Sequence, residues 1–156
     1  MNWDAIGALG ELVGAIAVVI SVLYLAWQVR SQVQETKLNA IHEVSHGFRE
    51  GIAATFLDKQ LSELFVAAKD DAEKLTEAER LQFVAFVQRN YRVWEDAFYQ
   101  RRQGRLDELH WRSMERQYSS LLSWPGVRWV WDIRRDFYTP EFAAYVDSLE
   151  PGPHRF

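Results

Sequence analysis

The chain has 156 residues, a net charge of −4 at neutral pH and no Cys. The missing Cys excludes disulfides, thiol catalysis and cysteine metal sites, and the acidic balance argues against a general nucleic-acid binder. Beyond residue 30, nine Phe, five Tyr and five Trp supply bulky side chains for a hydrophobic core.

The first predicted element is an apolar run over residues 5–27 that contains one charged residue, Glu11. A helix rises about 1.5 Å per residue, so the run is roughly 35 Å long, enough to cross a bilayer. Trp3 and Trp27 stand at its two ends, where indole rings favour the membrane–water interface. The run lacks the basic leader and the small-residue cleavage site of a signal peptide. We therefore predict a transmembrane anchor over residues 1–30.

Basic residues flank this run on its C-terminal side, at Arg30, Lys37 and Arg49. Cytoplasmic flanks of membrane spans carry the excess of Lys and Arg. This asymmetry predicts that the N-terminus lies outside and that residues 31–150 form a cytoplasmic domain.

Small residues gather on one side of the predicted span. Gly7, Gly10, Gly14, Ala17 and Ser21 are spaced 3, 4, 3 and 4 residues apart, which places them on one helix face. Such a face lets two helix backbones approach closely, so the pattern favours self-association or docking on a partner membrane protein. The alternative is that these glycines reflect only the general frequency of Gly in membrane helices.

Glu11 lies beside this small face, about 9 Å in from the outer end of the run. A carboxylate at that depth is costly and usually faces a bundle interior, a cavity or a partner. Three interpretations remain open. Glu11 is protonated and hydrogen-bonded across a helix interface, or it pairs with a basic group of another subunit, or it lines the wall of a homo-oligomeric pore.

Beyond Trp27 every segment reads as helix, with no period-2 alternation that would predict a strand. One apolar stripe comprises Leu38, Ile41, Ser45, Phe48, Ile52 and Phe56. Further helices are predicted around 58–69, from a Thr76–Glu79 capping box to about 103, from about 106, at about 127–136, and from Thr139-Pro140 onward. Gly104 suits a helix end, and residues 151–156 form a tail. The fold class is therefore all-α: a span followed by a helical bundle.

The sequence His42-Glu43-Val44-Ser45-His46 matches the H-E-x-x-H motif. On a helix this spacing puts His42 and His46 one turn apart as zinc ligands, with Glu43 as general base. Arg49 and Ile52 occupy the Gly and third-His positions of the longer motif, so a third ligand must come from elsewhere. The best candidate for it is Glu95.

Two weaker patterns lie further along the chain. Glu95, Asp96, Glu108, His110 and Glu115 are candidate ligands inside a bundle, although the paired Glu-x-x-His signature of di-iron bundles is absent. Residues 101–135 carry eight Arg against four acidic residues, which is either a solvated helix face or a surface for anionic lipid headgroups.

The chain resembles a family of small bacterial single-pass membrane proteins without assigned function. The resemblance is carried by Trp3 to Arg30, which fit W-x-A-I-G-x-x-G-E-x-x-G-A-x-A-V-V-I-x-x-x-Y-L-A-x-Q-x-R. It continues through Leu75-Thr76-Glu77, Gly104, Trp111, Pro125-Gly126-Val127-Arg128 and Pro140-Glu141-Phe142. The resemblance implies one N-terminal span and a helical cytoplasmic domain at a bacterial inner membrane. It supplies no substrate, cofactor or catalytic residue.

The sequence thus favours a non-enzymatic role, as an oligomeric scaffold or as an accessory subunit of a membrane complex, with no cofactor. The partners are the lipid bilayer and either further copies of the chain or another membrane protein, and no nucleic acid. In this interpretation Trp3, Trp27 and Arg30 anchor the span at the interfaces. The alternatives are a membrane-anchored zinc metallopeptidase that uses residues 42–46, and a homo-oligomeric pore with Glu11 at its wall.

Overall fold

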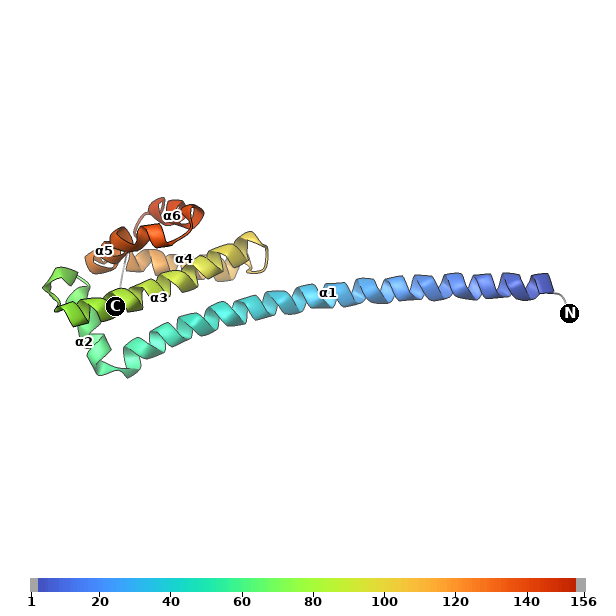
Figure 1. Cartoon of the computed structure of the whole chain (residues 1–156), viewed down its shortest axis with the longest axis horizontal. Coiled ribbons are helices and arrows are strands. Elements are labelled where there is room, and N and C mark those ends of the chain that lie inside the picture. Colours follow the sequence, from blue (N-terminus) through green and yellow to red (C-terminus); the bar gives the residue numbers. More distant parts are fainter. Residues whose placement is uncertain (1–2, 154–156) are drawn as a thin grey trace. The chain divides into compact units, whose positions relative to one another are not determined.

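The structure is a computed structural model that describes residues 3–153, apart from the side chains of residues 5, 6, 52 and 54–56. Within these residues the regular elements are all helical, which confirms the all-α prediction. In chain order they are α1 (Trp3–Leu57), α2 (Lys59–Ala68), the 3₁₀ helix η1 (Ala72–Lys74), α3 (Glu77–Arg102), α4 (Glu108–Leu121), α5 (Pro125–Arg134), the 3₁₀ helix η2 (Arg135–Phe137) and α6 (Pro140–Asp147) (Figure 1).

The chain divides into two compact units, Met1–Leu38 and Asn39–Phe156. The first unit holds the first part of α1. The second holds the last part of α1 together with α2 to α6. The sequence left open whether the apolar helix ends near residue 30, and the structure shows one helix from Trp3 to Leu57. This helix is long and apolar enough to cross a membrane, and none of its 18-residue apolar window is buried.

The helix boundaries in the second unit follow from capping residues. The Asp58 carboxylate accepts hydrogen bonds from the backbone N–H groups of Gln60 and Leu61, at 2.8 and 3.2 Å, and so begins α2 directly after α1. At the start of α3, Glu79 donates its N–H to the Thr76 hydroxyl and accepts from the Thr76 N–H. This reciprocal pair confirms the predicted capping box.

Later boundaries agree with the prediction to within two residues. Gly104, with φ of +68°, follows α3 in the left-handed conformation that favours glycine. The next helix begins at Glu108 with Asp107 as its cap, and Leu106 is buried outside it. Pro125 is the first residue of α5, two residues before the predicted start, because a proline fits a position whose N–H has no partner within the helix.

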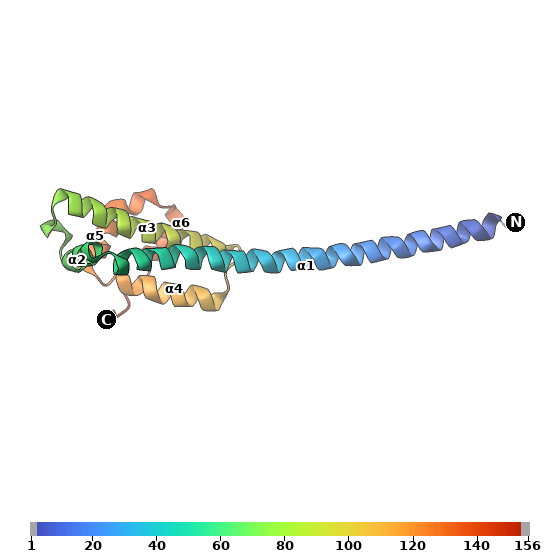
Figure 2. The ribbon, with the colours of Figure 1, turned by 90° about the horizontal axis from the view of Figure 1, so that it is seen from below.

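In the second unit, α3 packs against α2, α4 and α5 (Figure 2), and aromatic rings supply the largest side chains of the core. Trp94 of α3 is completely buried and stacks on Tyr118 of α4, with ring centres 4.9 Å apart. Phe142 of α6 meets the same indole edge-on at 5.6 Å. The other fully buried large side chains are Phe83, Trp111, Val130, Trp131 and Val146. Rings of this size bury the most apolar area per residue, which lets short helices form a stable core.

The last part of α1 packs on this core through small residues. Ala40, Val44 and Gly51 are buried, and Gly47 lies against Val93 of α3. We call Gly47 and Gly51, which lie against Val93 and Asn90 of α3, the α1–α3 seam. A β-carbon at Gly47 would lie 3.1 Å from Val93 Cγ2, and one at Gly51 would lie 2.8 Å from Asn90 Oδ1. The two helices therefore approach closely where α1 has no side chain.

This seam corrects the predicted apolar stripe. Leu38, which begins that stripe, is 58% exposed, whereas Ile41 and Phe48 are half-buried against the core. The side chains of Ile52 and Phe56 lie outside the described residues. The buried line is displaced toward smaller residues because α3 packs close to the α1 backbone.

Gly126 holds the start of α5 against the end of α2. Its N–H donates to the Lys69 carbonyl at 2.9 Å, and a β-carbon here would lie 1.9 Å from the Ala68 carbonyl oxygen. At the end of the described chain, the Gly152 N–H donates to the Ser119 carbonyl at 3.1 Å. The segment after α6 therefore returns to α4.

Candidate functional site

The predicted association face of α1 is open. We call Gly7, Gly10, Gly14, Ala17 and Ser21 the small-residue stripe. Apart from the helix's own backbone, no described atom lies within 4 Å of a β-carbon built at any of its three glycines. The Ser21 hydroxyl donates to the Ala17 carbonyl at 2.8 Å, so it is satisfied within the helix. The stripe is therefore a bare backbone surface that a second helix can approach closely.

Large apolar side chains cover the remaining faces of the same segment, and they too are exposed. Leu9 is 67% exposed, Ile16 51% and Leu23 64%. Others with more than half of their surface exposed are Leu12, Val13, Val18, Val19, Ile20, Val22 and Leu25. A continuous apolar surface of this extent marks a membrane or protein contact.

Glu11 interrupts this surface with one carboxylate. Its side chain is exposed, and no hydrogen bond or ion pair joins it to another described residue. On a helix Glu11 points about 80° away from the middle of the small-residue stripe, so it borders that stripe.

The aromatic residues at the ends of the apolar run are also exposed, Trp3 by 70% and Trp27 by 65%. The Tyr24 ring lies 6.1 Å from the Trp27 ring, and Arg30 follows on the next helical turn. This end of the run therefore carries two amphipathic rings and one cation, the residue types that mark a membrane interface.

The H-E-x-x-H residues lie on α1, where His42, Glu43 and His46 are all exposed. His46 Nδ1 is 3.7 Å from Glu50 Oε1, and Arg89 donates to Glu50 at 3.0 Å. No group of three or more His, Asp or Glu in the described part of the chain is arranged to hold a metal ion. His46 therefore lies beside a surface ion pair between Glu50 and Arg89.

Glu95, the predicted third zinc ligand, has another position. It is the buried charged residue of the described chain, 6% exposed. Its Oε1 accepts from both the N–H and the hydroxyl of Thr139 at 2.9 Å, and its Oε2 accepts from Arg92 at 2.7 Å. Arg92 also donates to the Phe137 carbonyl at 2.8 Å. Both carboxylate oxygens are therefore occupied, and Glu95 joins α3 to the start of α6.

Sequence reasoning missed this link, although a signal for it exists. Thr139 begins α6 without a hydrogen bond from its own side chain to that helix. The first N–H groups of a helix need acceptors from somewhere, and a carboxylate on another helix supplies one here. An uncapped Thr-Pro start can therefore indicate a distant acidic partner.

Asp96, next to Glu95, faces α1. Partial burial raises the pKa of the Asp96 carboxyl, and the carboxylates of Glu95 and Glu43 raise it further, whereas Arg92 lowers it. The ionised form of Asp96 is therefore disfavoured first by burial and then by the nearby acidic groups.

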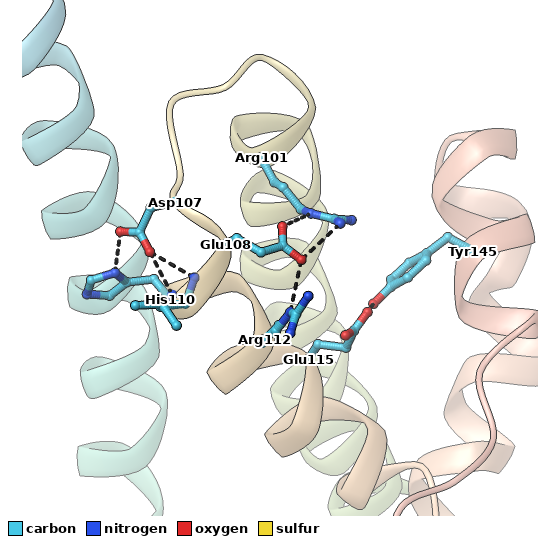
Figure 3. Close-up of polar contacts among 8 residues, drawn as sticks. Arg101, Asp107, Glu108, His110, Arg112, Glu115 and Tyr145 are labelled. Atoms are coloured by element: carbon cyan, nitrogen blue, oxygen red, sulfur yellow. Dashed lines mark hydrogen bonds and ion pairs between the residues drawn. The ribbon is translucent and has the colours of Figure 1, made fainter.

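The other predicted ligand residues are each engaged separately, as Figure 3 shows. Glu108 accepts from Arg101 at 3.1 Å and from Arg112 at 3.2 Å. The Tyr145 hydroxyl donates to Glu115 at 2.6 Å, and burial followed by this contact raises the pKa of Tyr145. Glu108 therefore links α4 to α3, and Glu115 links α4 to α6.

Asp107 caps α4 at the edge of the same region (Figure 3). Its Oδ1 accepts from the N–H groups of Leu109 and His110, at 2.9 and 3.0 Å. The hydrogen bond from the His110 backbone is the main reason that the pKa of Asp107 lies below its ordinary value. The His110 N–H is therefore one of the two backbone donors that Asp107 caps at the start of α4.

Most arginines of segment 101–135 are paired. The ion pairs are Arg101 and Arg112 with Glu108, Arg102 with Glu141, Arg128 with Asp132, and Arg135 with Asp147. Arg134 lies over the Phe137 ring at 5.2 Å. Acidic partners from within and outside the segment therefore offset its excess of Arg, which favours the solvated-face interpretation.

The chain was also compared with known proteins. No protein-family model, no curated protein and no solved structure matches it.

Proposed function

We propose that this protein is a membrane-anchored helical protein that acts as an oligomeric scaffold or as an accessory subunit of a membrane complex. Its association surface is the small-residue stripe of α1. The observation that carries the proposal is that this stripe is open on a segment of α1, residues 7–29, whose large apolar side chains are also exposed.

Placement in a bilayer accounts for the exposed apolar surface. Each Val, Leu or Ile side chain left in water costs about 1.5–3 kcal/mol relative to a buried one. More than a dozen such side chains on α1 are over half exposed. A bilayer removes this cost without a protein partner, and Trp3 and Trp27 are suited to its two interfaces. The resemblance of Trp3–Arg30 to small bacterial inner-membrane proteins supports the same placement, with the second unit in the cytoplasm.

Lipid alone does not account for the sorting of small residues onto one face. In a membrane, helices associate where small residues let their backbones approach. In the second unit, Gly47 and Gly51 of the same helix receive side chains of α3 in this way. The stripe around Gly10 and Gly14 is suited to a helix from a second copy or from another membrane protein.

Glu11 has a defined role in this proposal. An ionised carboxylate within the hydrocarbon layer is costly, so the protonated form is favoured there. A protonated Glu11 both donates and accepts a hydrogen bond, which adds a polar contact at the edge of a packed glycine interface.

Single-cysteine cross-linking tests the association face directly, because the chain contains no Cys to remove. We expect Gly10→Cys, Gly14→Cys and Ala17→Cys to form oxidised dimers in native membranes. Leu12→Cys and Ala15→Cys, which lie off the stripe, are the matched controls. Equal cross-linking at all five positions would contradict the proposed face, and no dimer at any position would contradict self-association through it. A cross-linked product whose mass exceeds that of the chain and differs from that of its dimer would identify a different partner protein.

Native mass spectrometry from mild detergent separates the remaining functions. The proposal predicts one discrete oligomer, or a complex with a partner, without a metal adduct. A monomer that carries one zinc ion would replace the proposal with the peptidase of His42, Glu43 and His46. Protease digestion of inverted membrane vesicles checks the orientation, and protection of the second unit would overturn its cytoplasmic placement.

A further inference from the structure

We draw no further inference here: the strongest candidate, the exposed apolar surface patch around Ile133 and Phe137 at the end of α5 and in η2, is an unpartnered face, and nothing in the structure shows what covers it.

Discussion

Helix α1 carries two glycine pairs with the same spacing, Gly10 with Gly14 in its first part and Gly47 with Gly51 in its last part. Side chains of α3 lie where β-carbons of the second pair would stand, whereas no described neighbour approaches the first pair. The spacing is identical, so the difference lies in the partner. The second pair shows how closely another helix approaches α1, and the first pair is where we propose that a partner helix binds.

The largest loss of stability is expected at a third glycine, Gly126, which also lies against another segment of the chain. Gly126→Ala places a β-carbon against the Ala68 carbonyl oxygen, a backbone atom that cannot rotate away. We expect the free energy of unfolding to fall by about 3 kcal/mol, since α5 must shift as a whole. Denaturant unfolding followed by circular dichroism measures it.

The matched control for this change is Gly152→Ala. A β-carbon there meets Ser119 Oγ at 3.5 Å, an ordinary contact distance. Its unfolding midpoint should stay close to that of the parent chain. Equal losses in the two variants would show that close approach at Gly126 does not limit stability.

The two glycine pairs of α1 should respond in opposite ways to a large side chain. Gly51→Leu overfills the seam and should lower the free energy of unfolding of the second unit by about 1–3 kcal/mol. Gly14→Leu should leave that unfolding unchanged and abolish oligomers in native mass spectrometry, because it separates the backbones of associating helices. If Gly14→Leu assembles like the parent chain, the small-residue stripe is not the association face.

The carboxylates of Glu11 and Glu95 differ in the same way as the two glycine pairs. Glu95 accepts three hydrogen bonds inside the second unit, and Glu11 makes none among the described residues. Glu95→Gln loses the charge opposite Arg92, and we expect a loss of about 2 kcal/mol in unfolding free energy. Glu11→Gln should leave unfolding unchanged and preserve cross-linking at Gly14→Cys, because an amide also donates and accepts. Loss of cross-linking would indicate an ionised Glu11 instead.

The smallest expected effect is a pH dependence confined to the second unit. The folded pKa of Asp107 lies below its ordinary value, so Asp107 stabilises the fold above its unfolded pKa of about 4. This contribution is lost as pH falls through the folded pKa. Asp107→Asn keeps a capping side chain that does not titrate there, so its denaturation midpoint should change less on acidification. Identical pH profiles for the two proteins would contradict the assignment.

Asp96 should contribute a pH dependence of stability opposite to that of Asp107. Its folded pKa is raised, so its contribution is present below the unfolded pKa and is lost as pH rises through the folded pKa. Asp96→Asn should therefore stabilise the second unit at neutral pH, because the amide does not carry the charge that burial and the neighbouring carboxylates disfavour; denaturant unfolding at pH 7 measures it.

The helices were largely predictable because their ends depend on local chemistry. Thr76 with Glu79, Gly104 and Pro140 act within one or two turns, so their effect on the helix ends does not depend on distant residues. The apolar N-terminal helix was predictable for a similar reason, since hydropathy and length are properties of one segment. Its placement in a membrane stays a prediction.

The α1–α3 seam and the position of Glu95 were not predictable, because both depend on tertiary contacts. The predicted apolar stripe correctly included Ile41 and Phe48, which pack against the core, but it also included the exposed Leu38 and missed the buried Ala40, Val44 and Gly51. Small residues at a close contact resemble solvent-facing small residues in a sequence. Likewise, the acceptor role of Glu95 appears only once α3 and the start of α6 are adjacent.

The distribution of tryptophan has a spectroscopic consequence. Trp3 and Trp27 are 70% and 65% exposed on α1, whereas Trp94, Trp111 and Trp131 are at most 1% exposed in the core. The native emission therefore comes from at least two optical populations. In a bilayer, quenchers attached to lipid chains would quench the fluorescence of Trp3 and Trp27, and the core indoles would continue to emit. Membrane insertion and unfolding of the bundle can thus be followed separately in one unlabelled sample.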